Sequence, residues 1–119
     1  TQWSSSAASD VYKRQIDVVC SDGLKPDPNS KLCASNNAMV NIETCEFSKN
    51  KGASELKTTW VDEEYDPNIE TFYYVRVLEN PTCRWSTWDA IKNNYEPRQG
   101  IDEIIQERAW SSPIWVNSN

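Results

Sequence analysis

Four carboxylates crowd one short segment of the chain. They are Asp62, Glu63, Glu64 and Asp66, and Pro67 follows them. A calcium loop of the EF-hand type needs alternating oxygen ligands, a central Gly and a closing Glu, and the Gly is missing here. Glycoside hydrolysis needs two carboxylates held across a cleft, which closeness in sequence does not supply. The segment therefore favours a solvated turn over a calcium site or an acid–base pair.

Aromatic side chains are the second group that could do chemistry, because flat rings can form a platform for sugars. Aromatic residues on strands more often belong to the core, above all where aliphatic residues are scarce, so we expect these to be buried. Two or more coplanar, exposed Trp side chains would instead indicate a carbohydrate-binding module. The set comprises Trp60, Trp85, Trp88, Trp110 and Trp115, together with Tyr73 and Tyr74.

The chain contains no histidine. It therefore lacks the usual general base near neutral pH and the commonest metal ligand. Ser86, Ser111 and Ser112 are left without the base that nucleophilic catalysis needs. From the residues alone we expect no catalytic residue, no metal ligand and no cofactor-binding residue in this chain.

The four cysteines are Cys20, Cys33, Cys45 and Cys83, which allow three complete pairings. We favour disulfides in an extracytoplasmic (periplasmic or secreted) compartment, each stabilising the fold by roughly 2–4 kcal/mol. Buried free thiols are the alternative. An all-thiolate zinc site is disfavoured, because no two cysteines form the close pair that structural zinc sites prefer.

Composition and charge limit the kinds of partner. The 119 residues allow a single domain, and a mean hydropathy of −0.74 predicts a small core. A net charge of −6 argues against nucleic acid, which is bound by clustered Lys and Arg. No apolar run approaches the roughly 20 residues of a membrane span.

Strands are expected to position these side chains, because short stretches of alternating apolar residues dominate the chain. The strongest covers residues 71–79 and is apolar on both sides, as is typical of the middle of a sheet. Within it, alternation directs Phe72, Tyr74 and Arg76 to one face and the intervening residues to the other. Further strands are predicted over residues 16–20, 38–47, 55–61 and 114–116, while residues 101–109 fit either a strand or a helix.

One short helix is predicted over residues 87–92. Ser86, followed three residues later by Asp89, resembles a capping box at its start. The fold class is therefore mainly β: a partial antiparallel β-sandwich-like region with a short helix and long loops.

Residues 1–15 differ from the rest of the chain. They lack apolar periodicity, and residues 10–15 resemble translated adapter sequence. We interpret residues 1–15 as a non-native or disordered extension and residues 16–119 as the β-rich C-terminal region of a larger protein. This region is expected to be incomplete at its N-terminal side, because residue 16 already stands in a strand. Expressed alone, residues 16–119 should be poorly soluble or partly unfolded.

Two segments resemble one known family. Residues 72–90 look like the signature segment of the family called domain of unknown function 3604, and residues 105–115 resemble its terminus. The resemblance runs from about Ile16 to Val116. The signature residues are Phe72, Tyr74, Arg76, Arg84, Trp85, Asp89, Glu107, Arg108, Trp110 and Pro113.

The resemblance implies a role within a longer protein. Members of that family are several times longer, and their N-terminal part is similar to metal-dependent phosphoesterases of the polymerase-and-histidinol-phosphatase superfamily, with an early His-x-His motif. No such motif occurs here, so a divalent metal is expected only in the missing N-terminal domain.

The function implied for this chain is a non-catalytic accessory or structural region of a metal-dependent hydrolase, packed against the catalytic domain. The alternative is a small carbohydrate-binding module that uses surface aromatics. An independent enzyme would need a convergent acid–base pair in a pocket without help from histidine.

Overall fold

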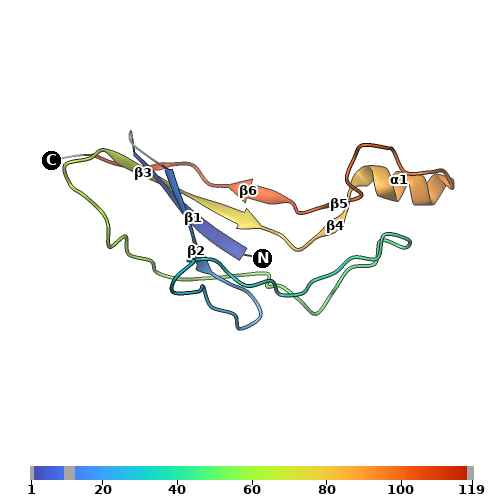
Figure 1. The fold of residues 1–119 in the computed structure, drawn as a ribbon, viewed down its shortest axis with the longest axis horizontal. Helices are drawn as coiled ribbons and strands as arrows, with labels where there is room; N and C mark the ends of the chain where they lie inside the picture. Colours follow the sequence, from blue (N-terminus) through green and yellow to red (C-terminus); the bar gives the residue numbers. More distant parts are fainter. Residues whose placement is uncertain (1, 10–12, 118–119) are drawn as a thin grey trace.

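The computed structural model describes residues 2–9 and 13–117, which form two antiparallel sheets, one helix and long coils (Figure 1). The predicted class, mainly β with a short helix and long loops, is confirmed. The elements in chain order are β1 (Gln2–Ser9), β2 (Lys13–Val19), β3 (Thr71–Leu78), β4 (Thr82–Cys83), α1 (Trp85–Asn93), β5 (Ile104–Ile105), β6 (Arg108–Trp110) and β7 (Ile114–Val116).

The larger sheet is built around β3. Its strand order is β2–β1–β3–β6, and β7 also pairs with β3, beside β6 along the same edge. The register places Trp115 opposite Phe72 and Trp110 opposite Arg76, all in antiparallel pairs. The prediction of a central strand rich in β-branched and aromatic residues is therefore confirmed.

β6 and β7 are two pieces of one edge strand, separated by a short break. Ser111 bridges the break: its backbone N–H donates to the Val75 carbonyl at 2.8 Å, and its Oγ accepts from the Val75 N–H at 2.8 Å. Pro113 follows, at an edge position where a missing N–H is tolerated. The hydroxyl thus replaces a backbone partner that an unbroken strand would have provided.

Residues 20–70 run mostly as coil along one side of the large sheet (Figure 1). The strand predicted over residues 38–47 is wrong, and only an isolated bridge joins Val40 to Phe47. Side chains compete for the backbone there: Asn41 Oδ1 accepts from the Glu43 N–H at 2.9 Å, and the backbone reverses with φ 61° at Cys45. The strand predicted over residues 55–61 is also wrong, because this stretch finds no ladder partner.

The helix prediction is confirmed, with α1 slightly longer than expected. Its N-cap is Arg84, without a side-chain hydrogen bond, whereas the expected cap Ser86 is buried inside the first turn. The left-handed Asn94, with φ 59°, ends the helix. Thr87 Oγ1 donates to the Glu103 carbonyl at 2.8 Å and ties α1 to the coil before β5. Within the described residues, no helix is long and apolar enough to cross a membrane.

The first strand departs from the sequence-based interpretation. The sequence predicts no regular structure for residues 1–15, yet Gln2–Ser9 forms β1 and Lys13 begins β2. Backbone hydrogen bonding explains the difference, because a strand lying between two partners needs no apolar pattern of its own to form a ladder. The non-native origin of the segment stays a prediction.

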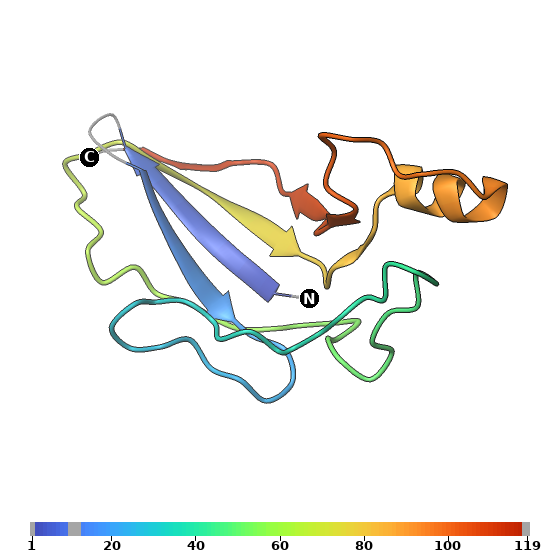
Figure 2. The ribbon, with the colours of Figure 1, turned by 45° about the vertical axis from the view of Figure 1, so that its right-hand side comes forward.

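The molecule is elongated (Figure 2) and has little core. Its extents are 61 × 29 × 23 Å, and its radius of gyration is 18.0 Å, whereas a compact domain of this length has about 13.5 Å. The buried apolar residues of the described part are all small: Cys20, Cys45, Cys83 and Ala90. The larger rings lie at intermediate depth or on the surface, which differs from the buried aromatic core that the sequence suggested.

Candidate functional site

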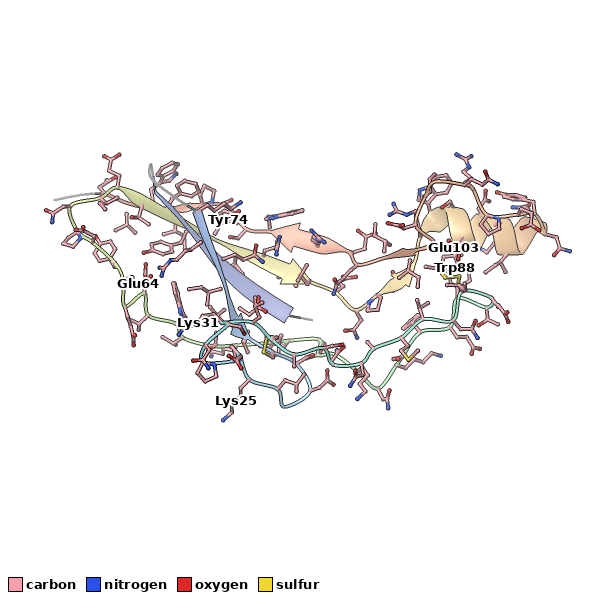
Figure 3. All side chains as sticks on the ribbon, in the orientation of Figure 1. Lys25, Lys31, Glu64, Tyr74, Trp88 and Glu103 are labelled. Atoms are coloured by element: carbon pink, nitrogen blue, oxygen red, sulfur yellow. A yellow bond between two sulfur atoms is a disulfide. The ribbon has the colours of Figure 1, made fainter. Side chains whose placement is uncertain are left out.

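The large sheet has one covered face and one open face. The coil of residues 20–70 lies along the covered face, and the label for Tyr74 marks the open face in Figure 3. The Phe72 ring lies 4.7 Å from the Trp115 ring and 6.3 Å from the Tyr74 ring, between centroids. Trp110 stands on the same face, because its register partner is Arg76. We call the residues Phe72, Tyr74, Trp110 and Trp115 the open aromatic face.

Cations border this face although the protein as a whole is acidic. Lys13 Nζ lies 5.3 Å from the centre of the Tyr74 ring, within the range of a cation–π interaction. Arg76 and Arg108 occupy open-face positions by register, opposite Trp110 and Leu78 respectively. The local surface therefore combines flat rings with positive charge, which suits a partner with acidic or aromatic groups.

A second group of exposed rings lies at the far end of the molecule, on α1. Arg98 lies 5.5 Å from the Trp85 ring, and Lys92 lies 5.9 Å from the Trp88 ring. The expectation that the tryptophans are buried is wrong for four of them. Their exposed fractions are 64% for Trp85, 40% for Trp88, 60% for Trp110 and 66% for Trp115.

The covered face holds the acidic segment. Trp60 meets the Tyr73 ring edge-on at 6.2 Å, and the Tyr73 hydroxyl donates to Asp62 Oδ2 at 2.6 Å. Burial, followed by the hydrogen bond and the charge of Asp62, raises the pKa of Tyr73 to about 12. Arg14 forms ion pairs with Asp62 and Glu64.

Carboxylates of the acidic segment make ion pairs and turn hydrogen bonds. Asp66 Oδ1 accepts from the Asn68 N–H at 2.9 Å, as in an Asx turn. A cavity of about 360 Å³ lies beside the segment, and Arg14, Lys31 and Trp60 contribute to its lining. Among the residues that the structure describes, no group of three or more His, Cys, Asp or Glu could hold a metal ion. Ion pairing and turn formation therefore account for Asp62, Glu64 and Asp66.

All four cysteines form disulfides. Cys20 pairs with Cys33, and Cys45 pairs with Cys83. The first closes the loop that follows β2, and the second ties the middle of the long coil to β4. Of the three pairings that the sequence allowed, the structure selects the sequential one, in which each cysteine pairs with a neighbouring cysteine along the chain.

A polar knot of Asp22, Asn36, Gly52 and Asn80 joins four segments of the chain, and sequence reasoning missed it. Asn36 Nδ2 donates to Asp22 Oδ2 at 3.0 Å and to Asn80 Oδ1 at 2.9 Å, while Asp22 accepts from the Gly52 N–H at 2.9 Å. Hydrogen bonds from Ser21 and Gly52 lower the pKa of Asp22. The only sequence signal is the frequency of Asn and Asp in turns, and it does not say which of them meet.

The signature residues separate into three places. One group lies on or beside the open aromatic face, and another lies around the start of α1. The remaining two shape the edge: the Glu107 carbonyl accepts from the Glu79 N–H at 2.9 Å, and Pro113 lies in the break between β6 and β7. The first group is Phe72, Tyr74, Arg76, Arg108 and Trp110, and the second is Arg84, Trp85 and Asp89.

Fold and surface together define a mainly β region with two disulfides and a solvent-exposed aromatic sheet face. The chain matches the family described as Protein of unknown function (DUF3604) over residues 3–118 and belongs to that family. The match begins further upstream than the resemblance near Ile16 had suggested. No curated protein and no solved structure matches the chain significantly.

Proposed function

We propose that this chain is the non-catalytic C-terminal accessory region of a larger metal-dependent hydrolase of phosphoesterase type, whose substrate is uncharacterised. The open aromatic face packs against the catalytic domain, and this contact stabilises that domain or shapes its entrance. Paired disulfides support an extracytoplasmic location for the protein, because such bonds persist in oxidising compartments.

Surface area is the observation that carries the proposal. The chain exposes 8668 Å², whereas a compact monomer of this mass exposes about 6,600 Å². The excess, roughly 2,000 Å², is larger than the ~800 Å² that each partner contributes to a standard interface. Rings such as Trp110 and Trp115 lie in this exposed surface, and burying them against another domain would stabilise both partners.

The metal of such a hydrolase does not fit the residues of this chain. Histidine is absent from the sequence, and the cysteines are bonded to one another. In the acidic segment, Asp62 and Glu64 are engaged by Arg14, and Asp66 is engaged by its own turn. The proposal therefore assigns the metal to the catalytic domain and gives the residues of this chain no part in holding it.

Oxidation of tryptophan by N-bromosuccinimide, mapped by mass spectrometry, tests the proposed packing. In the dilute isolated chain, Trp85 and Trp110 should react at similar rates, because their exposed fractions are 64% and 60%. In the longer protein, Trp110 and Trp115 should react at least tenfold more slowly. Trp85 serves as the matched control at the far end of the molecule.

Equal reactivity of Trp110 in the longer protein and in the isolated chain would exclude packing through this face. The same experiment addresses the second candidate function, a carbohydrate-binding module, which the exposure of Trp85, Trp110 and Trp115 favours. In that case neutral oligosaccharides, and not the catalytic domain, should protect the rings from oxidation.

A further inference from the structure

β1 occupies the middle of the large sheet in an unusual way. It lies between β2 and β3, runs antiparallel to both, and separates two strands that do not pair with each other. All eight of its residues, Gln2–Ser9, are in register with β3. Removing β1 would leave a slot one strand wide between β2 and β3, with unpaired backbone groups on both sides.

The residues of β1 are poorly suited to this central place. Six of the eight are Ser or Ala, whereas β3 is built from aromatic and β-branched residues. Small residues add little to the cross-strand pairs that stabilise a sheet. The backbone ladder is what holds β1, and any strand without proline can form the same ladder.

The covered face shows what a better occupant would supply. Ser5 stands opposite both Ile16 and Val75, and Ala7 stands opposite Arg14 and Tyr73. Register partners share a face, so positions 5 and 7 of β1 belong to the covered face by register. On that side a cavity of about 370 Å³ is lined by Val75 together with Val18, Val19, Leu56, Lys57, Thr58 and Trp60.

We propose that the slot between β2 and β3 is a strand-acceptor site, and that β1 is an exchangeable occupant of it. Its proper ligand is an eight-residue extended strand of the longer protein, antiparallel to both neighbours, with β-branched apolar residues at the positions of Ser5 and Ala7. Two adjacent apolar positions on one face would fill the space lined by Val75 and Trp60. The proposal rests on the proposed function only for the source of the strand.

The short separation between β1 and β2 along the chain supports an occupant from the same polypeptide. Only residues 10–12 separate the two strands, so a strand directly upstream of β2 in a longer chain can reach the slot without a linker. Antiparallel neighbours that lie close along the chain also pair fastest and at least entropic cost.

A peptide-binding experiment on the full 119-residue chain tests the slot. The substitution Ser6→Pro removes a ladder donor in the middle of β1 and should open the slot. The probe is a fluorescein-labelled peptide of sequence Gln2–Ser9 that carries Ser5→Val and Ala7→Val. Anisotropy should show that the Ser6→Pro chain binds it at least tenfold more tightly than the unchanged chain does.

A second peptide tests which face of the bound strand must carry the apolar residues. It carries its two valines as Ser4→Val and Ser6→Val, on the opposite side of the strand, and should bind at least fivefold more weakly. Hydrogen exchange should slow in β2 and β3 when the first peptide binds, but not in α1. Equal binding of both peptides, or protection outside the slot, would overturn the proposal.

Two further arms keep the test decisive. If the Ser6→Pro chain does not fold, two double variants of the intact chain test the slot instead. Ser5→Val with Ala7→Val should raise the urea concentration at the unfolding midpoint. Ser4→Val with Ser6→Val should leave that midpoint unchanged. The longer protein should bind no added peptide, because its own strand fills the slot. Peptide binding to the longer protein would contradict the proposal that the occupant is a strand of that protein. Protection of tryptophan from oxidation tests the open aromatic face, whereas peptide binding tests the slot between β2 and β3. The proposed function and the strand-acceptor site can therefore fail independently.

Discussion

Tyr73 is the residue through which the acidic coil is fixed to the sheet. Its ring packs on Trp60, and its hydroxyl donates to Asp62, which also pairs with Arg14. The sequence placed Tyr73 on the face opposite Phe72, and the register confirms this. It did not reveal the contact with Asp62, because the two residues are 11 positions apart and the coil between Asp62 and β3 follows a path without periodicity.

The first prediction concerns the ionisation of this tyrosine. Burial, together with the nearby Asp62, raises the pKa of Tyr73 to about 12. A raised pKa means that the folded state holds the proton more tightly, so this stabilisation is complete below pH ~10 and is lost as the pH rises towards ~12. Spectroscopic titration of tyrosinate should show a late step that disappears in Tyr73→Phe.

Asp62→Asn supplies the complementary variant. It removes a negative charge and a charged acceptor, so the pKa of Tyr73 should fall towards the ordinary tyrosine value. Burial remains, so the fall should be incomplete. An unchanged late step in Asp62→Asn would show that the hydrogen bond to the carboxylate does not contribute. Glu63→Gln, which lacks this contact, is the control.

Strands that carry their own apolar alternation could be predicted from the sequence, whereas β1 and the coils could not. The alternation of residues 71–79 identified β3 and its central place, and the final apolar triplet identified β7. Residues 38–47 alternate as well, yet their Asn and Thr side chains bond to the local backbone and produce turns. Alternation specifies a strand only where a partner ladder exists, and partners are not visible in a single sequence.

Disulfides replace ladders in the coil, and the second prediction concerns them. In the chain-entropy description, a bridge that spans 38 residues stabilises the fold by about 4 kcal/mol and one that spans 13 residues by about 3 kcal/mol. The paired change Cys45→Ala with Cys83→Ala should therefore reduce the free energy of unfolding more than Cys20→Ala with Cys33→Ala.

Urea unfolding followed by tryptophan fluorescence measures both variants. Loss of the bridge to Cys83 should also loosen the middle of the long coil between β2 and β3, so proteolysis should begin within residues 38–52. A smaller loss for Cys45 and Cys83 than for Cys20 and Cys33 would mean that the coil is held mainly by the polar knot of Asp22 and Asn36.

At the scale of the whole molecule, the exposed surface is large compared with the buried core. The buried apolar residues of the described part are four, all Cys or Ala, while rings such as Trp110 and Trp115 lie in water. Composition indicated a small core, but it could not show that strand pairing would leave one side of the sheet without a covering layer. A sheet face of this kind is stable in isolation only when something covers it.

The last prediction follows from this imbalance. At tens of micromolar, the isolated chain should associate, and light scattering after gel filtration should show species larger than 13.7 kDa. Trp110→Ser with Trp115→Ser should shift the population towards monomer, because these changes remove apolar area from the open aromatic face. Trp85→Ser should leave the population unchanged, since Trp85 is equally exposed but stands on α1. If instead Trp85→Ser alone dissolves the assembly, the association uses the helical end, and the face that seeks a partner is the one around α1.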